Sequence, residues 1–569
     1  MENWNSTSSK IQSSVGQIFV EMADYDFSKP YRPPQSDSVR GSSFVISHYK
    51  NEIYLLTNAH VVDGAINIKI RFMQTGKTNF TAKLVAFCPW KDIALVKILN
   101  PTKELLNTAL PLKFSDSAQV SLADNVIVAG YPLGEENIQF AKGNVSGYHA
   151  GNDEKEEEET SYIQITAPLN PGNSGGPVFN TNNEVIGIAA AGFMFHQNIG
   201  YAIPTRTVLA VLVEMIRVAK EDLLVIIYQP KLDFKWSTGS NQLCYKIMES
   251  DTCQTYTGIN IRSVYPTSCL SNLTTYDDDF CQKVISITQH LSDEKDIVAV
   301  EMVKNMNEVL EQKCPDRIPR TDIKSASLLV DDILLEMSIS NIYTEKTFDV
   351  PTLFEDNVKY TQEGRLTFKF DNNGQAVVED SKYINRKLNL MEISDMIPYN
   401  SKISVKVLRK KNIVTINNIP YYPREVILWM VNNIYPRFEP HRFRYVIFAG
   451  LCVSQLVYQH DSTEIKVFLR PGIYGKYLVI TTLFKGGILD DIHSLENGDI
   501  LTHVNDKSVK TIDELIMALK DAKTQKLMDL KFMNGVKVVL DTQKVIESDR
   551  NIIQEYEIPI NEQSKEWLL

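Results

Sequence analysis

The sequence predicts a mainly β protein that also carries α+β modules. The chain has 569 residues, and because a domain usually takes about 100–200 residues, three or four domains are expected. Over residues 41–215, short runs of β-branched and apolar residues alternate with Gly, Asn, Asp and Pro turns. That spacing is typical of an all-β sandwich or barrel. The composition, 43% apolar and 23% charged, is that of ordinary globular domains.

Two further elements are predicted at the ends of this β-rich region. Residues 1–40 are polar and proline-rich towards their end, so we expect a loop or arm with one strand at 15–21. Residues 205–222 should form a closing helix, because their apolar residues recur at helical spacing. These apolar residues are Val208, Leu209, Leu212, Val213 and Ile216.

The most informative motif is the run Pro-Gly-Asn-Ser-Gly-Gly-Pro at residues 171–177. A serine among glycines can present its hydroxyl beside backbone amides that point at a bound oxygen, which is what acyl transfer requires. Ser174 is therefore the candidate nucleophile. The turn formed by Gly172, Asn173 and Ser174 is the candidate oxyanion hole, with the amides of Gly172 and Ser174 as donors. The bland alternative is a tight turn with no chemistry.

A nucleophilic serine also needs a base and a group that orients the base. The candidate base is His60, which follows an apolar strand expected at 53–56 and a turn at 57–59. Histidine has an unperturbed pKa of about 6.5 and can accept a proton near neutral pH.

The candidate orienter is Asp92, which immediately precedes a run of β-branched and apolar residues expected to form a strand. A carboxylate bonded to the imidazole would fix its tautomer and stabilise the imidazolium. Asp63 is the alternative orienter, but it precedes Gly64 and suits a turn.

These motifs, in the order His, Asp, Ser, resemble the chymotrypsin-like serine proteases and, within them, the HtrA/Deg family, nearest to its eukaryotic members. The resemblance rests on TNAHVV, KDIALVKI and PGNSGGPV and covers about residues 15–215. VAGYPLG at 128–134 and IGYAIP at 199–204 also resemble that family.

The resemblance implies a chymotrypsin-like double β-barrel with His60, Asp92 and Ser174 as its catalytic triad. Asn173 stands where digestive proteases have an Asp that pairs with an amino terminus freed by cleavage. Asn cannot form that ion pair. Activation is therefore expected to come from loop ordering rather than from zymogen cutting.

The remainder of the chain resembles the PDZ modules of the same family. Strand-like segments at 258–266, 328–337 and 403–409 resemble a first PDZ-like domain, interrupted by a large insertion at about 270–325. The expected domains are an arm at 1–40, the protease domain at 41–222, PDZ-like domain 1 at 235–415, and a linker strand with PDZ-like domain 2 and a carboxy-terminal tail at 420–569.

The second PDZ-like domain is the clearer of the two. Strands are expected at 478–480 and 527–533, and a turn followed by a strand is expected over 496–505. A helix is expected after Thr511, with Glu514 at capping-box distance. A Gly-Leu-Gly-Phe type carboxylate-binding turn is not visible in either module, and residues 471–475 are the nearest candidate in the second.

Charge and motif content exclude several classes of partner. The net charge of −11 is spread along the chain, which argues against nucleic acid. The longest apolar runs fall short of a membrane span. No CxxC pair and no GxxxxGK[ST] motif occur, so we expect no metal, no cofactor and no dependence on ATP.

The expected compartment follows from the cysteines and the amino terminus. Seven dispersed cysteines and a start without a basic or apolar leader stretch predict free thiols and a cytoplasmic or nuclear location. The acidic run at 153–159, shortly before the candidate nucleophile, is either a solvated loop or a regulatory loop.

The leading functional hypothesis is an ATP-independent serine endopeptidase of protein quality control or processing that acts on unfolded or extended polypeptides. The family resemblance implies a trimer-based homo-oligomer. The primary pocket is expected near Ala189, Ala190, Ala191 and Gly192. No acidic residue occurs between Glu184 and Pro204, which favours apolar substrate side chains over Lys or Arg.

Two alternatives remain open. The chain could be a protease-like scaffold or chaperone that binds unfolded or terminal peptides without turnover. It could also be an esterase of the α/β-hydrolase kind, since residues 172–176 fit the letters GxSxG. That elbow needs a helix after the serine and its histidine last in the chain, whereas residues 177–179 are expected to form a strand and His60 comes first.

Overall fold

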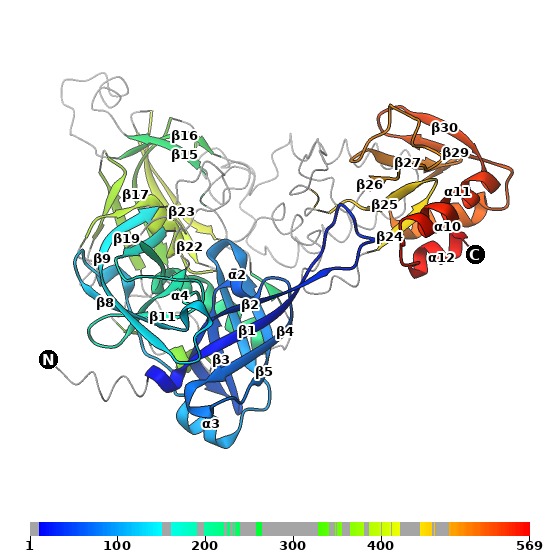
Figure 1. Ribbon diagram of the computed structural model, residues 1–569. Coiled ribbons are helices and arrows are strands. Elements are labelled where there is room, and N and C mark those ends of the chain that lie inside the picture. The colour runs from blue at the N-terminus through cyan, green and yellow to red at the C-terminus, as the bar shows by residue number, and fades with distance from the viewer. Residues whose placement is uncertain are drawn as a thin grey trace. The chain divides into compact units, whose positions relative to one another are not determined.

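The computed structural model describes residues 11–150, 161–190 and 199–220, then 225–238, 258–264 and 328–421 with gaps, and 444–568 with gaps on either side of residue 460 (Figure 1). The chain divides into two compact units. The first unit comprises Met1–Ile18, Arg40–Val61 and Ile70–Arg424, and the second comprises Phe19–Val39, Val62–Lys69 and Glu425–Leu569.

The first sheet closes on itself to form a barrel. Its strands β3 and β6 consist mostly of apolar residues and are almost entirely buried. The strand order is β5 (Phe80–Cys88), β4 (Ala65–Phe72), β1 (Val15–Asp24), β2 (Gln35–Tyr49), β3 (Glu52–Thr57) and β6 (Ile93–Ile98). Strand β6 pairs back to β5, and β14 (Val225–Ile226) joins β5 in parallel.

A second sheet closes in the same way, because β11 pairs with both β8 and β12. Its strand order is β11 (Pro177–Phe179), β8 (Asn125–Gly130), β9 (Gln139–Ala150), β10 (Ser161–Ile165), β13 (Gly200–Pro204) and β12 (Val185–Ala190). Strands β7 (Phe114–Ser115) and β18 (Thr347–Phe348) extend this sheet beyond β12. The two closed sheets confirm the double barrel that was expected for this region.

One apolar core joins the two barrels and the helix that follows them. It contains Phe44 and Leu56 of the first sheet, Phe179 of the second, and Val208 and Leu212 of the helix. The helix is α4 (Thr205–Lys220), as its apolar spacing predicts. Among the described residues, no helix has the length and apolar character needed to cross a membrane.

The amino-terminal segment is more ordered than the expected arm. A strand is present where 15–21 predicted one, but β1 runs on to Asp24, and β2 begins at Gln35. Only residues 25–34 lie between them, and these hold the three prolines at 30, 33 and 34. The proline-rich composition marked a turn between two barrel strands rather than a free arm.

A second β module completes the first unit. Its strands are β15 (Phe234–Thr238), β16 (Ile259–Val264), β17 (Ile333–Ser340), β19 (Arg365–Phe370), β20 (Gln375–Glu379), β21 (Leu388–Asn389), β22 (Lys402–Arg409) and β23 (Asn412–Pro420). The described part of the segment expected at 258–266 forms β16, and the segment expected at 403–409 lies in β22. The strand expected at 328–337 begins only at residue 333. The insertion at about 270–325 lies outside the described residues.

The described residues from 444 onward contain a sheet and three helices (Figure 1). The sheet comprises β24 (Tyr445–Phe448), β25 (Leu451–Gln455), β26 (Leu478–Leu483), β27 (Ile500–Val504), β28 (Lys507–Ser508), β29 (Leu527–Phe532) and β30 (Lys537–Asp541). The helices are α10 (Ile512–Ala522), α11 (Thr542–Glu555) and α12 (Glu562–Leu568). The capping box predicted for α10 is present, with Thr511 Oγ1 accepting from the Glu514 amide at 3.3 Å and Glu514 Oε2 accepting from the Thr511 amide at 3.0 Å.

A buried histidine links the segment between β1 and β2 to the sheet of the second unit. His460 Nε2 donates to the Phe27 carbonyl oxygen at 3.2 Å, and the Val457 amide donates to His460 Nδ1 at 3.0 Å. The side chain is fully buried, and this burial lowers the pKa of His460 from 6.5 to about 4. The folded unit therefore holds a neutral imidazole.

The replacement His460→Asn should flatten the acid sensitivity of this unit. Because the folded pKa is depressed, stability from His460 is complete above about pH 6.5 and is lost as pH falls towards 4. The loss amounts to about 3 kcal/mol, at roughly 1.4 kcal/mol for each pKa unit. Amide hydrogen exchange of β25 at several pH values measures the free energy of unfolding of this unit. In the variant, the decrease of that free energy between pH 6.5 and 4 should be absent.

The comparison with the variant is needed because another group in this unit titrates in the opposite sense. Burial raises the pKa of Asp549 from 3.8 to about 6, so its contribution improves as pH falls through that range. The difference between wild type and His460→Asn isolates the histidine. An unchanged slope in the variant would contradict the assignment.

Candidate active site

The structure brings His60 and Asp92 into direct contact. His60 lies on α2 (Ala59–Val62), a single helical turn directly after β3, where the sequence predicted a strand end followed by a turn. Its Nδ1 lies 2.8 Å from Asp92 Oδ2 and 3.0 Å from Oδ1, and its backbone amide donates to Oδ1 at 2.9 Å. The imidazole Nδ1 is therefore hydrogen-bonded to Asp92, the orienter that the sequence favoured over Asp63.

The backbone around Asp92 explains why its carboxylate can reach the imidazole. The 3-10 turn η2 (Pro89–Lys91) ends at Asp92, whose φ of 52° and ψ of 43° are left-handed. Asp and Asn tolerate this conformation better than most residues. The Asp92 amide donates to the Pro89 carbonyl at 3.1 Å, and Asn58 Nδ2 donates to the Asp92 carbonyl at 3.0 Å. These bonds turn the carboxylate towards α2 before β6 begins.

Glycines shape the turn that carries Ser174. Gly172 and Gly175 have φ values of +103° and +84°, a region that other residues rarely adopt. A Cβ on Gly172 would collide with the Tyr131 carbonyl oxygen, and a Cβ on Gly175 would collide with the Ser42 carbonyl oxygen. Both positions therefore require glycine. This requirement explains the glycine-rich run.

Ser42 on β2 holds this turn in place. Its amide donates to the Ser174 carbonyl at 2.8 Å, and its Oγ donates to the Gly172 carbonyl at 2.7 Å. The Tyr131 amide donates to the same Oγ at 3.0 Å. Ser42 is completely buried. The sequence offered no signal for this residue, because its role depends on a strand more than 100 positions from the turn.

The Ser174 turn lies against the segment that leads to His60. A Cβ on Gly175 would meet Thr57 Oγ1 and the Asn58 amide nitrogen, and a Cβ on Gly41 would lie between Val61 and the Ser174 carbonyl. Ser174 itself is only 5% exposed. His60 thus comes from α2 after β3, Asp92 from the end of η2, and Ser174 from the glycine-rich turn, which packs against Thr57 and Asn58.

Some backbone amides of the turn donate hydrogen bonds to other described residues, whereas others do not and are called unused here. The Asn173 amide donates to the Asn170 carbonyl at 3.0 Å, and the Gly175 amide donates to the Ala189 carbonyl at 2.9 Å. Within the described part of the chain, the amides of Gly172 and Ser174 have no hydrogen-bond acceptor. They are the two donors that the sequence analysis selected for the oxyanion. Asn173 belongs to the turn but contributes no unused amide.

The expected substrate pocket is only partly described. Ala189 and Ala190 are buried in β12, and the Ala189 amide donates to the Gly176 carbonyl at 2.8 Å, which ties β12 to the Ser174 turn. Ala191 and Gly192 lie outside the described residues, as do the acidic run at 153–159 and the candidate binding turn at 471–475. The pocket stays a prediction.

The strand after Ser174 argues against an α/β-hydrolase. Residues Pro177–Phe179 form β11, and this strand pairs with β8 and β12 of the second barrel. A nucleophile elbow would place a helix there.

Comparison with known proteins agrees with this geometry. The model of the trypsin-like peptidase domain matches residues 41–188, and that of the PDZ domain matches residues 479–566. In Arabidopsis thaliana, the chloroplastic protease Do-like 2 is 33% identical over 198 residues, which is 34% of this chain and 31% of the relative. The chain is a relative of the Do-like, or HtrA/Deg-type, serine proteases.

Other relatives support the same assignment. The putative mitochondrial protease Do-like 3 of Arabidopsis thaliana is 32% identical over 47% of this chain and 44% of its own length. A probable periplasmic serine endoprotease, DegP-like, of Chlamydia trachomatis is 35% identical over 31% of this chain and 33% of its own. The chain thus spans less than half the length of these Do-like relatives. The HtrA-type protease AlgW with tripeptide matches 74% of this chain and 97% of its own, at 18% identity and a TM-score of 0.42.

The relatives also correct the expected compartment. The cytoplasmic or nuclear location predicted from the cysteines and the amino terminus is wrong, because the Do-like relatives are named as chloroplastic, mitochondrial and periplasmic. Cys88 and Cys452 are unpaired and fully buried, and burial raises the pKa of both thiols to about 12. Buried thiols of this kind stay unpaired without help from a reducing compartment, so they carry no information about location.

Proposed function

We propose that this chain is an ATP-independent serine endopeptidase that cuts unfolded or extended polypeptides in protein quality control or processing. Ser174 is the nucleophile, His60 the base and Asp92 the orienter. The observation that carries the proposal is the double contact of Asp92 with His60, next to a serine turn that holds two unused amides. The trypsin-like domain match and the Do-like relatives support it.

The proposed roles give a reaction sequence. Because Asp92 accepts a hydrogen bond from the Nδ1–H group, the proton of the neutral imidazole stays on Nδ1. His60 Nε2 therefore keeps its lone pair and can accept the Ser174 hydroxyl proton. Oγ then attacks the scissile carbonyl, and the amides of Gly172 and Ser174 stabilise the oxyanion. The imidazolium, stabilised by Asp92, passes its proton to the leaving amine. Water then hydrolyses the acyl-enzyme by the same route.

The assembly and partners belong to the same proposal. The PDZ domain match at 479–566 supports recruitment of an extended peptide, since PDZ domains bind such peptides by adding a strand to a sheet edge. A trimer-based homo-oligomer is proposed from the family resemblance alone, and mass measurement in solution tests it.

Covalent labelling tests the proposal directly. The full-length protein is treated with a fluorophosphonate probe, the labelled peptide is located by mass spectrometry, and casein degradation is followed without ATP. We expect one labelled site at Ser174 and casein fragments. Absence of labelling, together with tight binding of unfolded casein, would contradict the enzyme assignment and support a peptide-binding scaffold.

The primary specificity should favour apolar side chains. The buried residues Ala189 and Ala190 are small and carry no charge, and no acidic residue lies between positions 184 and 204 that could pair with Lys or Arg. Sequencing of the casein fragments should therefore show cuts mainly after apolar residues. A profile dominated by cuts after Lys or Arg would contradict this assignment of the pocket.

A further inference from the structure

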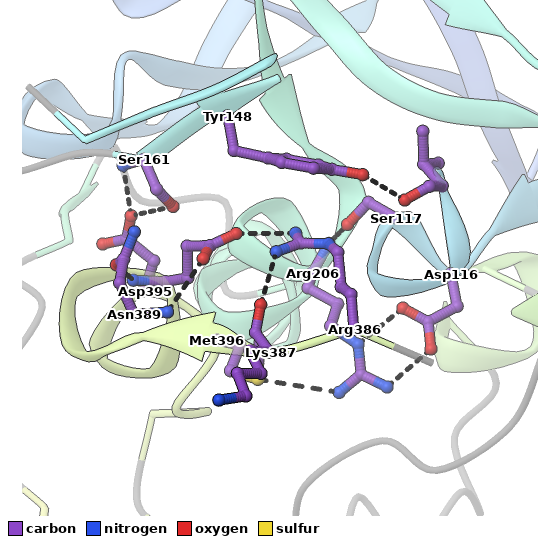
Figure 2. Close-up of polar contacts among 12 residues, drawn as sticks. Asp116, Ser117, Tyr148, Ser161, Arg206, Arg386, Lys387, Asn389, Asp395 and Met396 are labelled. Carbon is purple, nitrogen blue, oxygen red and sulfur yellow. Dashed lines mark hydrogen bonds and ion pairs between the residues drawn. The ribbon is translucent and has the colours of Figure 1, made fainter. Parts of the chain in front are cut away.

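A helix of the second β module reaches the catalytic barrels through a buried carboxylate. Asp395 is the last residue of α8 (Leu390–Asp395), and its side chain is 1% exposed. Its Oδ1 accepts from the ammonium of Lys91, and its Oδ2 accepts from the Ser161 hydroxyl at 2.6 Å and from the Ser161 amide. Figure 2 shows Asp395 facing Ser161 at the start of β10.

Lys91 connects this carboxylate to the candidate triad. It is the last residue of η2 and directly precedes Asp92, whose left-handed conformation depends on the end of that turn. Its side chain is 9% exposed. A chain of contacts therefore runs from Asp395 through Lys91 and one peptide bond to Asp92, and from Asp92 to His60.

The position of α8 is itself fixed by a network of polar contacts (Figure 2). Asn389 Oδ1 accepts from the Glu392 amide at 2.9 Å, and Glu392 Oε2 accepts from the Asn389 amide at 3.0 Å, which forms a capping box. Glu392 Oε1 accepts from Arg386 at 2.6 Å. The Arg386 guanidinium lies 3.5 Å from the ring centre of Tyr148 on β9, so α8 is held against the second barrel.

We propose that Asp395 is a positioning residue for the proteolytic reaction, supplied to the barrels by the second β module. It fixes the end of η2 through Lys91 and so sets the Asp92 carboxylate against His60. The inference rests on the proposed function, because it acts through the proposed triad. Loss of the Asp395 charge removes the carboxylate partner of a buried ammonium, a costly state.

The test compares full-length wild type, Asp395→Asn and a matched control, Asp332→Asn. Asp332 is also 1% exposed and is paired with Arg409 at 2.7 Å, but its contacts with other described residues stay inside the second β module. The measurements are kcat and KM for an extended peptide substrate, and the pH dependence of Ser174 labelling by the fluorophosphonate probe.

We expect Asp395→Asn to lower kcat by about ten- to a hundredfold, the effect of a displaced catalytic group, with KM within about twofold of wild type. The acidic limb of the labelling profile should move to lower pH, because a displaced Asp92 stabilises the imidazolium less. Asp332→Asn should leave kcat, KM and the labelling profile unchanged. Adding Lys91→Met to Asp395→Asn should recover much of the lost kcat, since it removes the buried ammonium whose charge Asp395 balances in the wild type.

The outcomes separate this inference from the function on which it rests. If the wild-type protein is not labelled at Ser174, this result contradicts both the proposed function and the positioning role. A labelled wild type with Asp395→Asn indistinguishable from Asp332→Asn overturns the positioning role alone. If Asp395→Asn does not fold, the positioning role is tested with Ser161→Ala, which removes one hydrogen bond to the same carboxylate. A lower kcat at constant KM supports the role, and a wild-type kcat refutes it.

Discussion

Replacing Ser174 with alanine should lower kcat on an extended polypeptide by about 10⁴- to 10⁶-fold. The variant keeps the glycine turn and its unused amides, because Ser174 is anchored through its backbone carbonyl to the Ser42 amide. Only the attacking oxygen is lost. The measurement is casein degradation in parallel with wild type, at equal concentrations of folded protein.

Ser47→Ala is the matched control for this variant. Ser47 is completely buried in β2 of the same protein, and its hydroxyl has no hydrogen-bond partner among the described residues. Removing it should leave kcat close to wild type. Casein degradation by Ser174→Ala at more than about a hundredth of the wild-type rate would show that another residue is the nucleophile.

The second large effect is expected at the orienter, where Asp92→Asn should lower kcat by about 10⁴-fold. Asp92 Oδ1 accepts the His60 backbone amide at 2.9 Å, and an asparagine oxygen would keep that bond. The new amide group then occupies the place of Oδ2 and donates to Nδ1. This forces the proton onto Nε2, so the imidazole can no longer accept the Ser174 proton.

The fold should survive this change, since the asparagine keeps the shape of the side chain. Steady-state kinetics measures the loss of kcat, and circular dichroism of the same samples shows whether the fold is kept. Asp63→Asn serves as control, because Asp63 was the alternative orienter, and it should cost no more than about threefold. If the two substitutions have equal effects, the assignment of Asp92 fails.

The candidate triad could be predicted from sequence because each member lies in a compact local motif. The strand before His60, the strand after Asp92 and the glycines around Ser174 are all readable within about ten positions. Capping at Thr511 and the helix α4 were predictable for the same reason, as both depend on spacing along one element. Local chemistry of this kind needs no knowledge of the fold.

Other features depended on residues that are distant along the chain. Ser42 bonds to the Gly172 carbonyl across 130 positions, and Asp395 pairs with Lys91 across 304. Neither residue stands in a motif. Within residues 1–40 the sequence predicted the strand at 15–21 but not the start of β2 at Gln35, because only the closing of the barrel shows that this segment has strand partners.

The amino-acid order alone determined which side chains are candidates for the chemistry, since a nucleophile, a base and an orienter need particular functional groups and glycine permits a particular backbone. Tertiary structure alone decided how those groups are held. Hydrogen bonds and buried charges between segments arise only when the sheets close and α8 docks, because burial, not sequence distance, makes an unpaired group costly.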